Sequence, residues 1–128
     1  MELRTDKIRA CFDRKIGNFT ELWNLSTNTN YVRCAPRDPL IELYGLKNGE
    51  RVKLSGHISD VAEAPDALIL SYDSFGEYDI SAKVTCRCEQ DRLVFSAEIC
   101  NHSTIDVTEI LMPHLGGIYL GNGQKDYL

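Results

Sequence analysis

The chain has 128 residues, 43% of them apolar, and a formal net charge of -5. This is the length of one ordinary domain, and the apolar fraction suffices for a core without disulfide bonds. The negative charge argues against a nucleic-acid or anionic-membrane surface, because both need a positive field. We therefore expect a single domain, residues 1–128, with no nucleic acid and no membrane among its partners.

Turn residues divide the first half of the chain into short apolar runs. Residues 15–18 (KIGN) separate residues 8–12 from 19–25, and residues 48–49 (NG) separate residues 40–46 from 52–54. Gly and Asn between apolar runs are typical of β-hairpins. These runs are therefore predicted to be strands.

An acidic stretch follows, because six acids and no Lys or Arg lie between Lys53 and Lys83. We expect a solvated edge with acidic loops, including a turn at residues 74–76. A calcium loop at Asp73, Glu77 and Asp79 is the alternative, although its spacing matches no EF-hand.

The clearest strand is predicted over residues 79–88, where apolar and polar residues alternate with a period of two. Cys86 and Cys88 fall on its apolar face, where a thiol acts as a small hydrophobe. Residues 89–91 give a polar turn, and residues 92–99 alternate again, so a hairpin is expected. Residues 105–115 are predicted to be a strand bent near its end, since they begin with β-branched residues and contain Pro113. No stretch has a clean helical period, so the predicted fold class is an all-β antiparallel sandwich.

The five cysteines are an odd number in a chain that opens without a secretory signal. A reducing, cytoplasmic location and five free thiols are expected.

Motifs that carry chemistry are not found. His57, His102 and His114 are isolated in the sequence, so neither a metal nor a cofactor is expected. No nucleophile elbow occurs, and paired carboxylates for glycoside hydrolysis cannot be assigned by spacing. Residues 121–123 (GNG) indicate a tight turn rather than a phosphate loop. Aromatic residues that could stack on a sugar are Trp23, Tyr31, Tyr44, Tyr72, Phe75, Tyr78, Tyr119 and Tyr127.

Several segments, in order, resemble a known domain type. They are residues 8–24, the run PLIEL at 39–43, residues 93–103, and residues 107–113 followed by GIYLG at 117–121 and DYL at 126–128. This succession is similar to the galactose-mutarotase-like supersandwich domain that precedes the catalytic barrel in many glycoside hydrolases. The resemblance implies a supersandwich-like fold and no catalytic residue in this chain, because the catalytic carboxylates of such enzymes lie in the barrel.

The function implied by the resemblance is that of a non-catalytic N-terminal domain. It would pack against a downstream catalytic domain of the same chain and shape its sugar-binding mouth. The alternative is a self-standing carbohydrate-binding or protein-interaction module. The apolar end of the chain suggests an N-terminal fragment of a longer protein, with residues 112–128 facing the neighbour. His114, Asp126 and Tyr127 are the predicted substrate-binding residues, and the truncated chain could self-associate.

Overall fold

The longest hairpin of the fold is the one that the alternating sequence predicts. The computed structural model describes residues 1–115, and in it β9 (Ile80–Glu89) pairs antiparallel with β10 (Arg92–Asn101) along their whole length. Gln90 makes the turn with φ +52°. Cys86 and Cys88 are buried on the inner face, as expected.

Most of the acidic stretch is a second long hairpin, so the prediction of acidic loops is only partly correct: Asp66, Glu77 and Asp79 lie in turns or loops, whereas the other three acids lie on strands. β7 (Gly56–Ala64) pairs with β8 (Ala67–Phe75), and β8 pairs with β9, so the sheet order is β10-β9-β8-β7. The stretch can form strands because alternate residues of β8, among them Leu68 and Leu70, supply the core while the acids face water. The solvated edge was predicted correctly, since β7 is an edge strand.

The turn predicted at residues 74–76 begins later than expected. Ser74 and Phe75 are the last residues of β8, and the Phe75 side chain is fully buried. Gly76 starts the turn with φ +63°.

The N-terminal sheet contains four short strands in sequential order. They are β1 (Glu2–Arg4), β2 (Ile8–Phe12), β3 (Phe19–Asn24) and β4 (Thr29–Asn30). The predicted turn between β2 and β3 is present, and Gly17 adopts φ +75° in it. A Cβ at this glycine would lie 2.7 Å from a Leu70 methyl carbon, so the turn packs directly on the second sheet.

The third sheet has the order β11-β5-β6. Here β5 (Glu42–Lys47) and β6 (Glu50–Leu54) form the predicted hairpin at Asn48-Gly49, and β11 (Asp106–Leu111) pairs with the other edge of β5. β11 is shorter than the predicted strand and contains a bulge between Val107 and Glu109. The chain leaves the sheet after Leu111, before Pro113, which cannot donate to a strand ladder.

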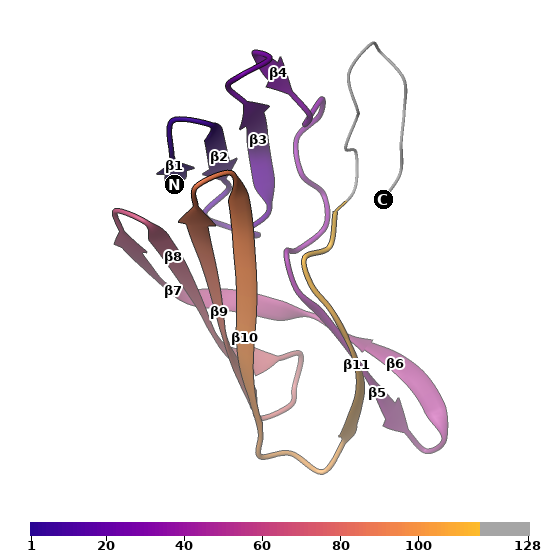
Figure 1. Ribbon diagram of the computed structural model, residues 1–128. Coiled ribbons are helices and arrows are strands. Elements are labelled where there is room, and N and C mark those ends of the chain that lie inside the picture. The colour runs from indigo at the N-terminus through magenta and orange to yellow at the C-terminus, as the bar shows by residue number, and fades with distance from the viewer. Residues whose placement is uncertain (116–128) are drawn as a thin grey trace.

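The three sheets pack on one another around a common core, so the all-β antiparallel sandwich is confirmed within residues 1–115 (Figure 1). The segment before β5 and the segment after β11 run side by side in Figure 1, and the His114 amide donates to the Leu40 carbonyl at 2.9 Å. This hydrogen bond continues the β5–β11 pairing past the end of the sheet and places His114 beside the start of β5.

Candidate functional site

An open groove lies between the N-terminal sheet and the edge of the second sheet, with a volume of about 470 Å³. Its apolar lining comes mainly from β3, from β10 and from the segments beside them. The apolar and aromatic lining residues are Ile8, Phe19, Leu22, Trp23, Tyr31, Leu93, Phe95 and Leu115.

The groove exists because β10 is an edge strand whose inner face is only partly covered. Leu93 and Phe95 alternate inward along β10 and are half-buried, whereas the inward residues of its neighbour β9 are buried. The Phe95 ring meets Phe19 of β3 edge to face, with centroids 6.0 Å apart, and so joins the two sheets. The groove is therefore a continuation of the core that opens to solvent.

The polar residues of the groove are few, and all except the half-buried Asn24 are exposed: Lys7, Asn24, Ser26, Asp91 and Arg92. Among the described lining residues, Asp91 is the one carboxylic acid. Glycoside hydrolysis needs two carboxyl groups across a groove, so this lining is suited to binding rather than to that chemistry.

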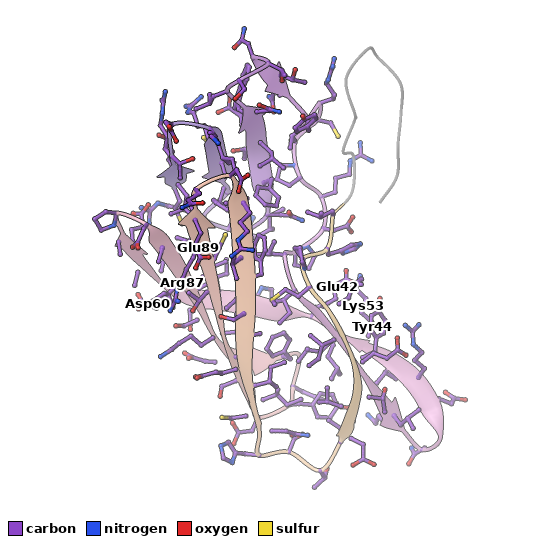
Figure 2. The ribbon with its side chains drawn as sticks, in the orientation of Figure 1. Glu42, Tyr44, Lys53, Asp60, Arg87 and Glu89 are labelled. Carbon is purple, nitrogen blue, oxygen red and sulfur yellow. The ribbon has the colours of Figure 1, made fainter. Side chains whose placement is uncertain are left out.

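A polar cluster lies on the third sheet, at the start of β5; it consists of Asp38, Glu42, Tyr44, Lys53 and His114. We call it the Glu42 cluster. Glu42 is 2% exposed, and its Oε1 lies 3.0 Å from Lys53 Nζ and 3.3 Å from His114 Nδ1. The Tyr44 hydroxyl donates to Oε2 at 2.9 Å. Figure 2 shows Glu42, Tyr44 and Lys53 together on this sheet.

Glu42 is held in its charged form. Burial opposes ionisation of this carboxyl, yet the Lys53 ammonium, the Tyr44 hydroxyl and His114 together keep the pKa of Glu42 below its ordinary value. In return, the Glu42 carboxylate raises the pKa of Lys53 and that of Tyr44. The cluster is thus a buried carboxylate beside the Lys53 ammonium, the Tyr44 hydroxyl and the His114 ring.

The surface beside the cluster extends this network along the sheet. The guanidinium of Arg51 lies 3.8 Å from the centre of the Tyr44 ring and donates to both carboxylate oxygens of Glu109, at 2.8 and 3.0 Å. These side chains share the outer face because the β5–β6 and β5–β11 registers place Tyr44 beside Lys53 and Glu109.

Asn18 fixes the backbone around the cluster. Its side chain is buried, and its amide nitrogen donates to the carbonyl of Asp38 at 2.9 Å and to that of His114 at 2.8 Å. One side chain from the β2–β3 turn therefore holds together two segments that are 76 residues apart in the chain.

Among residues 1–115, one group of side chains has the composition and proximity to hold a metal ion. It consists of Asp38, Glu42 and His114, whose ligand atoms all lie within 4.8 Å of one another. Asp73, Glu77 and Asp79, the alternative calcium loop, are not brought together as such a group in this part of the chain.

Of the predicted substrate-binding residues, His114 is half-buried in the Glu42 cluster, whereas Asp126 and Tyr127 lie outside the described residues. Glu42, Asp38 and Lys53 were not predicted. The one signal for Glu42 was a lone carboxylate within an apolar run, residues 40–43.

The predicted sugar-stacking aromatics divide among several environments. Trp23 and Tyr31 line the groove, and Tyr44 belongs to the Glu42 cluster. Tyr72 and Phe75 are core residues, with ring centroids 5.5 Å apart. The others are Tyr78, which is half-buried, and Tyr119 and Tyr127, which lie outside the described residues.

All five cysteines are free, as predicted. Within residues 1–115, we find no helix with the length and apolarity to span a membrane. Comparisons with protein families, with curated proteins and with solved structures gave no match.

Proposed function

We propose that this chain is a non-catalytic β-sandwich domain of a carbohydrate-active enzyme, and that its groove packs against a catalytic domain of the same protein. The observation that carries the proposal is the open apolar groove between β3 and β10. The half-buried Leu22, Leu93 and Phe95 extend the core into it, and such a surface is stabilised when a partner covers it.

The chemistry of the groove favours packing over catalysis. Its charged residues, Lys7, Asp91 and Arg92, are exposed, and most of the remaining lining is apolar, which is the composition of a protein interface with a polar rim. The resemblance to the domain that precedes glycoside hydrolase barrels supplies the identity of the partner.

The first test is to read the coding sequence beyond codon 128. The proposal expects a glycoside hydrolase barrel to follow, and a stop codon with no barrel would contradict it. The chain and that barrel are then produced as separate polypeptides, and their association is measured by sedimentation.

Two variants of one strand test the groove itself. Leu93 is half-buried in the groove, whereas its neighbour Val94 points outward and is 36% exposed. Leu93→Ser is expected to weaken association with the barrel at least ten-fold, whereas Val94→Ser leaves it unchanged. Equal effects of the two variants would place the interface elsewhere.

A second candidate function is saccharide binding in the same groove. It is favoured by the groove's volume, which is that of a small-molecule site, and by Trp23, Tyr31 and the amide of Asn24 in its lining. Calorimetry against a panel of oligosaccharides tests it, because a binding module gives at least millimolar affinity that Tyr31→Ala removes. A domain that only packs against its neighbour gives no heat.

A further inference from the structure

Two buried atoms of the Glu42 cluster have no hydrogen-bond partner. They are Glu42 Oε1 and His114 Nδ1, 3.3 Å apart. Glu42 Oε1 does have an ion-pair partner, the Lys53 ammonium at 3.0 Å, so its charge is balanced by a cation whose side chain is half-exposed. A buried polar atom without a hydrogen bond costs stability, so two that face one another need an explanation.

The distance between these two atoms suits a shared ion. Ligand atoms bound about 2.0–2.1 Å from a tetrahedral zinc ion lie about 3.3 Å from one another. The Asp38 carboxylate supplies a third ligand, since one of its oxygens lies within 4.8 Å of a ligand atom of Glu42 and of one of His114. The three side chains together offer one nitrogen and two oxygens.

The groups around these ligands have the positions that a metal site requires. The Tyr44 hydroxyl donates a hydrogen bond to Oε2 of Glu42, so Oε1 is the oxygen that faces the metal ion. Asn18 holds the backbone of Asp38 and of His114, and the His114 amide is fixed by Leu40. Partners that orient ligands in this way are a regular feature of metal sites.

From this geometry we propose that Asp38, Glu42 and His114 bind a divalent transition-metal ion of the Zn²⁺ type. An imidazole ligand and a set of only three side chains disfavour Ca²⁺ and Mg²⁺, which prefer six or more oxygens or retain their waters. The fourth position is left to water. His114 binds through the Nδ1 lone pair, with its proton on Nε2.

Lys53 is the resident cation that the metal ion displaces. Its side chain is 48% exposed and flexible, so its ammonium can move into water when a divalent ion takes its place beside Oε1. Asp38 is exposed as well, which gives the ion a path from solvent. The bound ion joins the segment before β5 to the segment after β11.

The test uses the full chain with Cys34 and Cys100 replaced by Ser, because these two exposed thiols could bind zinc themselves. Calorimetric titration with ZnCl₂ is expected to show one ion per chain. Asp38→Asn, at an exposed position that leaves folding intact, and His114→Asn each weaken binding at least ten-fold. His102→Asn is the matched control, since His102 is exposed and outside the cluster, and it leaves the affinity unchanged.

Two further variants separate this site from an ordinary ion pair. Tyr44→Phe releases Glu42 Oε2 and is expected to weaken zinc binding on the order of ten-fold. Lys53→Met removes the competing cation and is expected to tighten it, whereas a simple ion pair would only lose stability. Titration with CoCl₂ is expected to give the visible absorption of a tetrahedral ion with nitrogen and oxygen ligands.

Several results would overturn the proposal. The site is refuted by an absence of saturable binding below about 100 μM Zn²⁺. Equal losses in His114→Asn and His102→Asn refute it too, as does a near-ultraviolet thiolate band in the cobalt spectrum. An affinity that is unchanged or weaker in Lys53→Met contradicts the displacement of Lys53 and with it the site.

Discussion

Gly45→Ala is expected to open the third sheet from its centre. Gly45 lies in the middle of β5, opposite Val107 of β11 and Val52 of β6, and is buried. A Cβ at this position would lie 2.7 Å from the carbonyl oxygen of Asp106 and 3.1 and 3.2 Å from two side-chain carbons of Ile105. Because the closest atom belongs to the backbone of the paired strand, rotation of a side chain cannot relieve the overlap.

The magnitude follows from two opposing effects. Overpacking costs typically 1–3 kcal/mol, about 3 where backbone must move, while replacing glycine lowers the unfolded chain's entropy and returns about 0.4–1 kcal/mol. We expect a net loss of about 2 kcal/mol, which for a chain of this size lowers the melting temperature by roughly 6–10 °C. β11 leads directly to His114, so the variant should also weaken zinc binding by the Glu42 cluster.

The assay is thermal and urea unfolding of three variants. Gly49→Ala is the control, since Gly49 has φ +78° and nothing lies within 4 Å of the added carbon, so its cost is backbone strain alone. Ile105→Val removes the Cδ1 atom that the Cβ of Gly45→Ala would contact. Added to the Gly45→Ala variant, it is expected to restore part of the lost stability, whereas added to Gly49→Ala it restores none. A Gly45→Ala variant that melts within 2 °C of the parent protein would show that the added Cβ meets no overlap, as would an Ile105→Val effect that is equal in the Gly45→Ala and Gly49→Ala backgrounds.

Burial raises the pKa of the Cys86 thiol to about 12. At pH 8 iodoacetamide should therefore modify the exposed Cys34 first and reach Cys86 only after denaturation. Early labelling of Cys86, detected by peptide mass mapping, would contradict its burial. Phe95→Ala is expected to cost about 2 kcal/mol in urea unfolding, because the ring is half-buried, whereas Val94→Ala on the outward face stays within about 0.5 kcal/mol; similar costs would mean that the floor of the groove is not core. Asn18→Ala should lower the free energy of unfolding by about 1–3 kcal/mol, since it leaves two carbonyl groups without their donor. The same variant should weaken zinc binding. An unchanged zinc affinity would show that Asn18 does not position the ligands.

The regular parts of this fold could be predicted from the sequence because their signals are local. The alternation over residues 80–88 and 93–99 sets which side chains face the core, and Asn48-Gly49 supplies the left-handed turn of a hairpin. The acids of the β7–β8 hairpin hide its strand pattern in the sequence, although they occupy only its solvent-facing and turn positions. A strand needs only one apolar face, so the acids on the other face do not prevent it from forming.

The groove and the Glu42 cluster were decided by the tertiary structure. Leu93 and Phe95 are only half-buried because β10 is the edge strand of its sheet. Alternation within one strand shows which residues face inward, but not whether the strand lies at an edge. His114 looked isolated because its partners, Asp38 and Glu42, lie more than 70 residues earlier in the chain. They meet because β11 pairs with β5 and Asn18 fastens the flanking segments, so the chemistry arises from long-range strand pairing rather than from a motif.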